Sequence, residues 1–382
     1  ESAMNELADQ LKIDPVQLRI LNEPKIDESL GIPFSSRHLV ECFRLGAEKF
    51  GWSKRTPAVG SMKRDGLTLG WGTAACSWGA GRFPAEATVQ LRSDGTARVA
   101  CGTQDIGTGT YTILAQLTSQ KTGVPLDKIE VALGDTSLPP GPISGGSLVT
   151  GSVVPAVFAA ADAAIAATMK VAMATPGSPF EKRKQEELKF EAGRIFVKAD
   201  GPSGGVPFAD ILKRANLRMA TGSGKGAPTF GDPKPKYSLH SFGCHFVEVT
   251  WQPEIVRLRV SRVVSVIDAG RILNPLAGRN QVEGSVVMGI GMALFEHTHY
   301  DPQNGAPINS NLADYVIAVH ADAPPIDVHF VDFPDKQINE LGARGIGEIG
   351  LAGVAAAITD AVHHATGVRV RELPVKIENL LV

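Results

Sequence analysis

The same order of predicted elements occurs twice along this chain of 382 residues. In residues 87–122, and again in residues 244–291, a β-hairpin leads through a polar loop into a helix. Ser93-Asp94-Gly95 is a strong turn signal in the first hairpin, and Gln252-Pro253-Glu254 forms the turn of the second. We interpret this repeat as a weak internal duplication, which predicts two similar halves facing a shared ligand.

The periodicity of apolar residues predicts the remaining elements. Residues 222–236 are rich in Gly, Pro and Lys, which predicts a flexible excursion over the surface. The mixture of hairpins and helices indicates the α+β class. We expect helices at residues 1–23, 36–51, 154–174, 207–215 and 354–365, a short helix within 311–325, and strands at 66–78, 128–133, 188–197 and 326–331.

Composition narrows the function classes. The net charge is −2, which gives no reason to propose nucleic acid or an anionic membrane surface as a partner. Cys42, Cys76, Cys101 and Cys244 form no CxxC pair, so we expect free buried thiols and neither a zinc nor an iron–sulfur site.

We see no signal peptide and no apolar run of transmembrane length. The chain opens directly into an amphipathic helix pattern, and we expect it to be part of a longer polypeptide.

Two loops of small residues come directly before predicted helices. Residues 102–110 follow the first hairpin, and residues 144–152 precede an Ala-rich helix. A Gly/Thr-rich loop at a helix N-terminus is the architecture of an anion-binding site. The spacing matches neither a Walker A loop nor the full dinucleotide fingerprint. Two such loops suit one extended anionic ligand better than two separate ligands.

A third glycine-rich stretch, residues 344–353, contains the carboxylate of Glu348 and leads into the last predicted helix. A Glu at the mouth of a helix is expected to interact with the positive end of the helix dipole. Glycines on both sides would allow a bulky cofactor or another backbone to come close. The plainer alternative is a Gly-rich turn in which Glu348 only favours the start of the helix.

Four motifs occur in one order along the chain: Gly102-Thr103-Gln104-Asp105-Ile106-Gly107-Thr108-Gly109-Thr110, Gly146-Ser147-Leu148-Val149-Thr150-Gly151, Asn274-Pro275 with Gln281-Val282-Glu283-Gly284, and Gly345-Ile346-Gly347-Glu348. Together they resemble the C-terminal half of the molybdenum-binding subunit of the xanthine dehydrogenase / aldehyde oxidase family. The resemblance covers essentially the whole chain. Within the family, the chain most resembles the bacterial multi-subunit aldehyde oxidoreductases. The closing run Arg371-Glu372-Leu373-Pro374 also resembles this family's tail.

The resemblance implies roles for individual residues. Glu348 matches the family's general base, and Gln281 matches a glutamine that hydrogen-bonds the cofactor. Many relatives have Gln in place of Thr108, where the backbone amides of Gly107 and Gly109 could still serve. The run Ser147, Leu148 and Val149 matches amides that hold the cofactor phosphate. Trp78, Arg82 and Phe83 fall where relatives place part of the substrate wall. The other matched cofactor-binding positions are Gln104, Asp105, Thr150 and Gly347.

The resemblance also implies a fold and a cofactor. Two related mixed α/β subdomains would bind the molybdopterin cofactor between them. Residues 1–65 would form the helical end of a preceding region, 66–236 the first subdomain, and 237–382 the second subdomain with the catalytic glutamate. The bacterial resemblance favours molybdopterin cytosine dinucleotide. In this family the pterin dithiolene holds the molybdenum, and no protein side chain ligates it.

The implied activity is oxidation of an aldehyde to a carboxylic acid, with water as the oxygen source and Glu348 as the general base. Electrons would leave through [2Fe-2S] clusters and FAD on partner subunits, because this chain has no cluster-ligand spacing. The remaining N-terminal part of the molybdenum subunit would supply the family's Gly-Gly-x-Phe-Gly-Gly loop and its glutamine near the metal. We expect no nucleic-acid or membrane partner, and a cytoplasmic and a periplasmic location both stay open.

Other functions compete with this interpretation. Hydroxylation of N-heterocycles or purines is the alternative within the family, whereas hydroxylation of CO or a thioester is less favoured. In a different class, the chain would be a non-catalytic phosphate- or nucleotide-binding module in which both Gly/Thr loops bind anions. A degenerate half that has lost activity is a third possibility, against which Glu348 and Gln281 argue. Measuring the molybdenum content distinguishes the two classes, because the enzyme requires molybdenum and the binding module does not.

Overall fold

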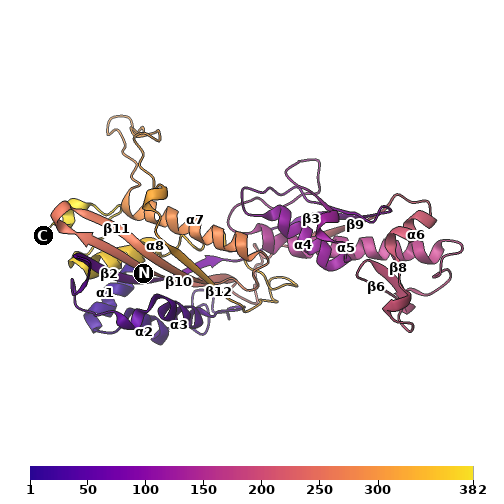
Figure 1. Ribbon diagram of the computed structural model, residues 1–382, viewed down its shortest axis with the longest axis horizontal. Coiled ribbons are helices and arrows are strands. Elements are labelled where there is room, and N and C mark those ends of the chain that lie inside the picture. Colours follow the sequence, from indigo (N-terminus) through magenta and orange to yellow (C-terminus); the bar gives the residue numbers. More distant parts are fainter. Residues whose placement is uncertain (382) are drawn as a thin grey trace. The chain divides into compact units, whose positions relative to one another are not determined.

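The computed structural model describes residues 1–381, which divide into two compact units. Unit 1 consists of Glu1–Gly79, Lys236–Pro334 and the chain from Ile346 onward. Unit 2 consists of Ala80–Pro235 and Asp335–Gly345. Each unit therefore combines segments that are far apart in the sequence (Figure 1). The three regions expected from the sequence stay a prediction.

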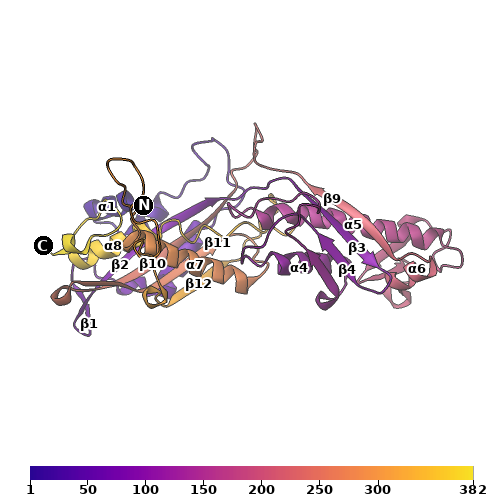
Figure 2. The ribbon, with the colours of Figure 1, turned by 90° about the horizontal axis from the view of Figure 1, so that it is seen from above.

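Unit 1 has three layers, with a five-stranded sheet in the middle (Figure 1; its strands are also labelled in Figure 2). Helices α7 and α8 cover one face of the sheet, and α2 and α3 cover the other. Helix α1 (Ser2–Leu11) packs against α2 and α8. The sheet order is β1 (Met62–Arg64), β2 (Leu67–Gly79), β10 (His240–Gln252), β11 (Arg257–Asp268) and β12 (Ile326–Val331), and the helices are α2 (Pro15–Leu21), α3 (Leu39–Phe50), α7 (Pro275–Leu294) and α8 (Val354–Thr366).

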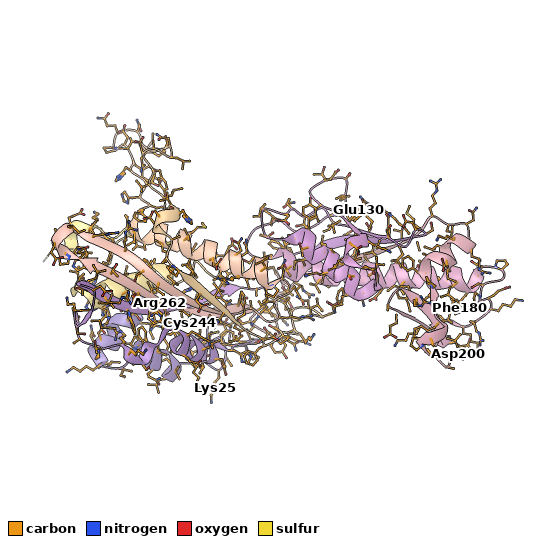
Figure 3. All side chains as sticks on the ribbon, viewed as in Figure 1. Lys25, Glu130, Phe180, Asp200, Cys244 and Arg262 are labelled. Carbon is orange, nitrogen blue, oxygen red and sulfur yellow. The ribbon has the colours of Figure 1, made fainter. Side chains whose placement is uncertain are left out.

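The side chains of β10 alternate between the two faces, as strand geometry requires. Val247, Val249 and Trp251 enter the core under α7 and α8. Cys244 and Phe246 enter the core under α3 (Cys244 is labelled in Figure 3). Because both faces are covered, this strand is buried along almost its whole length.

Unit 2 is built on a four-stranded sheet with helices on one face. Strand β3 alternates buried and half-buried residues, so one face of the sheet packs on the helices and the other is more open. The sheet order is β5 (Ile129–Ala132), β4 (Ala97–Ala100), β3 (Ala85–Arg92) and β9 (Met219–Gly226), with α4 (Thr110–Thr122) and α5 (Val149–Ala174). A smaller sheet of β6 (Leu188–Glu191), β7 (Arg194–Val197) and β8 (Val206–Pro207) packs with α6 (Phe208–Arg214) around the end of α5.

The predicted repeat of hairpin, loop and helix is present in both units. In unit 2 the order is β3, β4, α4 and β5, and in unit 1 it is β10, β11, α7 and β12. In each copy the first two strands are antiparallel, and the strand after the helix pairs in parallel with the second. The neighbour of the first hairpin strand is β9 in unit 2 and β2 in unit 1. In unit 2, β9 comes after the hairpin, helix and strand of the repeat, whereas in unit 1 β2 comes before them. The two units are therefore related by a circular permutation.

Glycines on β9 and β2 let a helix backbone come unusually close to each sheet. A Cβ atom at Gly222 or Gly224 would overlap the backbone of α5, and a Cβ at Gly70 or Gly72 would overlap the backbone of α8. The prediction of a flexible excursion from residue 222 was therefore wrong for residues 222–226, which lie in β9. The Gly-rich pattern resembles a loop, but it forms a strand because the Ala-rich helix α5 packs directly on it.

Two further predictions about α5 were wrong. The helix begins at Val149 rather than Val154, so Pro155 lies inside it. By length and composition α5 could also cross a membrane, whereas we expected no such run. Its buried residues pack against β3, β9 and α4, as those of a core helix do. The prediction of buried thiols was confirmed, because all four cysteines are buried and none forms a disulfide bond within residues 1–381.

We predict that Gly224→Ala destabilises the protein by at least about 2 kcal/mol, because the added methyl group overlaps the α5 backbone and forces the helix away from β9. The control is Ser223→Ala on the exposed face of the same strand, which should change the free energy of unfolding by less than about 0.5 kcal/mol. Thermal unfolding of both variants measures the difference. Equal melting temperatures would contradict the close packing of helix and strand.

Candidate active site

Glu348 lies in a run of turns, residues 347–353, that precedes α8. The amide of Leu351 donates to the Glu348 carbonyl at 3.1 Å, and Gly353 is the N-cap residue of α8. Glu348 is therefore outside the first turn of the helix. The expected interaction with the positive end of the helix dipole was wrong, because that field falls off within the first turn.

Ser285 of α7 holds this turn against the helix. Its Oγ lies 2.8 Å from the Gln281 carbonyl oxygen and 3.0 Å from the Gly347 carbonyl oxygen. A Cβ atom at Gly350 would lie only 2.9 Å from the Ser285 Cβ, so glycine allows the turn to lie flat on α7. The segments that carry Gln281 and Glu348 are thereby fixed side by side.

His245 holds the later part of the same turn. Its Nε2 lies 3.0 Å from the Ala352 carbonyl oxygen, and its Nδ1 lies 2.8 Å from Ser265 Oγ. Complete burial lowers the pKa of His245 to about 4, against the opposing effect of the hydrogen bond to Ala352. The imidazole is therefore neutral at physiological pH, with Nε2–H donating to Ala352 and Nδ1 accepting from Ser265.

In unit 2, the two glycine-rich loops meet. Ser144 donates its amide to Gln104 Oε1 at 3.1 Å and its hydroxyl to the Gln104 carbonyl at 2.6 Å. The Thr103 hydroxyl donates to the Pro142 carbonyl at 2.7 Å. The sequence suggested that both loops serve one ligand, and these bonds place them next to each other.

Asp105 fills the anion position of the first loop with its own carboxylate. The amides of Gly107, Thr108, Gly109 and Tyr111 donate to it at 2.9 to 3.2 Å. Burial acts to raise the pKa of Asp105, but these hydrogen bonds outweigh it and hold the pKa below its ordinary value. The amides of Gly107 and Gly109, which we expected to serve a ligand, thus already have an acceptor within the chain.

The second loop leads into α5, whose first turn contains no acidic residue. Ser147 has a positive φ of 60°, Leu148 is the N-cap residue, and Val149 and Thr150 are the first helical residues. The first intrahelical bond is from the Ser152 amide to the Leu148 carbonyl, so the amides before it have no acceptor within the helix. A helix N-terminus of this kind suits an anion, and the binding role of Ser147, Leu148 and Val149 stays a prediction.

Gly345, from the third motif, packs directly on the Ser147 carbonyl. A Cβ atom at Gly345 would overlap that carbonyl group and the Ser147 side chain. The positive φ of Ser147 and the missing Cβ of Gly345 therefore occur at one point of contact. Gly347 and Glu348 follow this contact directly in the sequence.

Arg82 and Phe83 lie at the first turn of α5, whereas Trp78 is at the end of β2 in unit 1. Ser152 Oγ accepts from the Phe83 amide at 2.9 Å, and the Arg82 side chain lies against Gly151. Burial lowers the pKa of Arg82, although its guanidinium stays charged. Arg82 Nε is buried and has no hydrogen-bond partner among the described residues.

Sequence reasoning missed several residues that shape the site. Ser285 occurs next to a motif, but nothing in its sequence context distinguishes it from any helical serine. His245 occurs in an apolar strand, where a core histidine is the default interpretation. Thr229 and Phe230 lie in the segment expected to be flexible, yet Thr229 hydrogen-bonds both the amide and the carbonyl of Arg82 at 2.8 and 3.0 Å, and the Phe230 ring covers Gly81.

Comparison with known proteins identifies the family. The model of the molybdopterin cofactor-binding domain matches residues 45–324. The chain belongs to this family. It is a molybdenum-binding subunit sequence of the xanthine dehydrogenase / aldehyde oxidase type, as the resemblance indicated.

Relatives in this family are about twice as long as the chain. The aldehyde oxidoreductase molybdenum-binding subunit PaoC of Escherichia coli K12 is 38% identical over 386 residues, covering 100% of this chain and 50% of the relative. The putative xanthine dehydrogenase molybdenum-binding subunit XdhA of the same strain is 30% identical, covering 100% of the chain and 51% of the relative. Quinoline 2-oxidoreductase from Pseudomonas putida 86 shares the fold, with a TM-score of 0.82 at 22% identity, covering 100% of this chain and 50% of that structure.

The residues of unit 2 fit a phosphate-bearing cofactor of this family. The amides at the start of α5 have no acceptor within the helix, and Arg82 Nε beside them has no hydrogen-bond partner among the described residues. Among residues 1–381, no group of three or more His, Cys, Asp or Glu side chains could hold a metal ion. The polar groups of the site are thus suited to hydrogen-bonding an organic group that carries phosphate.

The neutral state of His245 predicts a pH-dependent loss of stability. The folded pKa of about 4 lies below the ordinary 6.5, so the unfolded chain binds more protons and stability falls as the pH drops from 6.5 to 4. We expect His245 to contribute about 3 kcal/mol to this loss. Measuring the free energy of unfolding at pH 7 and pH 4 for the wild type and His245→Gln isolates the effect. The destabilisation caused by the substitution should shrink by about that amount at pH 4, and a constant difference would contradict the assignment.

Proposed function

We propose that this chain carries the catalytic base and part of the cofactor cradle of a molybdenum hydroxylase that oxidises aldehydes to carboxylic acids. The supporting observation is the Ser285 contact, which fixes the Glu348 turn against the helix segment that carries Gln281. The higher identity to an aldehyde oxidoreductase subunit than to a xanthine dehydrogenase subunit favours an aldehyde over a purine or other N-heterocycle.

Residues of several motifs would hold the cofactor. The amides of Ser147, Leu148 and Val149 at the α5 N-terminus would bind its phosphate, with Arg82 beside them. Gln281 would hydrogen-bond it from α7. When bound, the molybdenum cofactor supplies the two-electron redox chemistry and the activated oxygen. Molybdopterin cytosine dinucleotide is the form we propose.

Glu348 would act as the general base. Its carboxylate would accept the proton released when oxygen is transferred to the aldehyde carbon, and would later pass that proton to water. A general base must keep a fixed position relative to the proton that it removes. Ser285, Gly350 and His245 supply that rigidity, since they hold the turn on both sides of Glu348. Phe83 and Trp78 would contribute apolar substrate contacts.

The remaining components would come from outside this chain. We propose that [2Fe-2S] clusters and FAD lie on partner subunits and accept the electrons. The other part of the molybdenum subunit would complete the substrate pocket. These proposals agree with the length of the relatives, of which this chain covers about half.

Asp105 argues against the rival function, a module in which both loops bind anions. Its carboxylate already occupies the α4 N-terminus, and a second anion there would be repelled. The first turn of α5 contains no acidic residue. A single phosphate position suits a cofactor enzyme better than a module with two equivalent anion sites.

We predict that Glu348→Gln in the assembled complex lowers kcat for an aromatic aldehyde by about 10²- to 10⁴-fold, because the amide cannot accept the proton. Molybdenum content, measured by elemental analysis, should stay near one atom per complex. The matched control is Glu372→Gln at an exposed position, which should leave kcat unchanged. Full activity of Glu348→Gln in a molybdenum-loaded complex would refute the assigned base.

We predict that Gly345→Val lowers molybdenum content several-fold, because the added side chain displaces Ser147 from the α5 N-terminus. Gly204→Val is the control, since a side chain at Gly204 meets no neighbouring atom. Elemental analysis of both purified variants, with circular dichroism to confirm folding, gives the answer. Equal molybdenum in the two folded variants would show that the Ser147 loop does not hold the cofactor.

A further inference from the structure

Residues 297–319, here called the arm, leave the end of α7 and project away from the rest of unit 1 (Figures 1 and 3). The arm has a defined backbone held by local hydrogen bonds. Tyr300 and Pro307 form a β-bridge, and the Ile308 amide donates to the His299 carbonyl at 2.9 Å. Asn309 accepts from the His299 amide at 2.9 Å. The arm is therefore an ordered hairpin rather than a loose connection.

The arm exposes apolar side chains that it cannot bury itself. Leu312 is 80% exposed, and none of the arm's large apolar side chains is buried within the described chain. Among Asp, Glu, Lys and Arg the arm contains only Asp301 and Asp314, and it has no Lys or Arg. Depletion of charge, and of lysine in particular, is typical of the core of a protein interface. The exposed apolar residues are Tyr300, Ile308, Leu312, Val316, Ile317 and Val319.

Exposed side chains near the C-terminal end of α7 continue this apolar surface. Met288 and Met292 are exposed and four residues apart, so they lie on the same side of the helix. Gly284 falls in the same series, and a Cβ atom there would meet nothing within 4 Å. Glycine costs a helix about 1 kcal/mol relative to alanine, and no neighbour in the described chain requires it. A polypeptide packed closely on this face would require it.

The arm and these α7 residues together form a surface, here called the arm surface, with the character of a permanent interface. Exposed apolar patches of this kind are rare on free proteins and mark sites of association. Permanent interfaces are more hydrophobic than transient ones. We therefore expect the polypeptide that covers the arm surface to be present in a fixed ratio to this chain. The relatives match this chain over only half of their length, so the other half of the same subunit meets that condition.

We propose that the arm surface packs against the part of the molybdenum-binding subunit that lies outside residues 1–382. Ser285 of the same helix holds the Glu348 turn. Packing on Met288 and Met292 would fix the helix on which that turn depends. The proposal rests on family membership and does not depend on the reaction assigned to Glu348.

Site-specific photo-crosslinking tests this proposal in the full-length polypeptide, purified with its co-purifying subunits. A photoreactive amino acid replaces Met288 in one variant and Leu312 in another. A third replaces Ile255, which is 59% exposed at the turn between β10 and β11 and lies outside the arm surface. Mass spectrometry then identifies the crosslinked peptides, and mixing isotopically heavy and light protein separates crosslinks within a chain from those between copies.

We expect both arm-surface variants to crosslink within the same polypeptide to residues outside 1–382, several-fold more efficiently than the Ile255 variant. Crosslinks to a different subunit or to a second copy would overturn the choice of partner. Absence of crosslinks, in protein shown to be folded by circular dichroism, would overturn the docking surface itself. Activity of Glu348→Gln is unaffected by either result, so this proposal and the proposed reaction fail independently.

Discussion

The close approach of a helix backbone to a glycine-bearing strand determines where the site residues lie. In unit 1, Gly70 and Gly72 allow α8 to pack directly on β2, and Gly353 packs on the Ala75 carbonyl. A larger residue at Gly70 or Gly72 would push α8 away from the sheet, and one at Gly353 would displace the start of the helix. Because the Glu348 turn leads directly into α8, its position depends on this contact.

In unit 2, glycines on a strand likewise allow a helix backbone to pack closely on the sheet. Gly222, Gly224 and Gly226 on β9 allow α5 to approach, which fixes the N-terminus of α5 and the Ser147 loop before it. Gly345 then packs on Ser147. In both units, a loop with candidate function precedes a helix that is held by a stripe of strand glycines. The circular permutation between the units preserves this arrangement although the chain order differs.

Much of this fold follows from the sequence, and some of the site does not. The two hairpins, the helices after their loops and the four free cysteines have local signals such as Ser93-Asp94-Gly95, and the structure contains them. The repeated motif order also indicated the family, which the matching family model supports. Residues 222–226 were misjudged because their strand state depends on packing against α5, which no local pattern encodes.

The contacts around Glu348 could not be predicted from local sequence either. The position of the turn depends on one hydroxyl of Ser285 and one imidazole of His245, and both come from elements distant in sequence. A serine in a helix and a histidine in a strand have many possible roles, so only tertiary structure distinguishes these two. The helix expected at residues 354–365 is present as α8, but the sequence did not show that residues 347–353 form a run of turns before it.

Asp105 shows how two similar loops of one unit come to have different chemistry. Both loops precede helices, and each helix N-terminus favours a negative charge. At α4 the chain supplies that charge from its own carboxylate, with four amides bonded to it. The first turn of α5 contains no acidic residue, and the half-buried Arg82 side chain lies against Gly151 there. The first loop therefore already holds an anion from the chain itself, which is why we propose the phosphate for the second loop and not for the first.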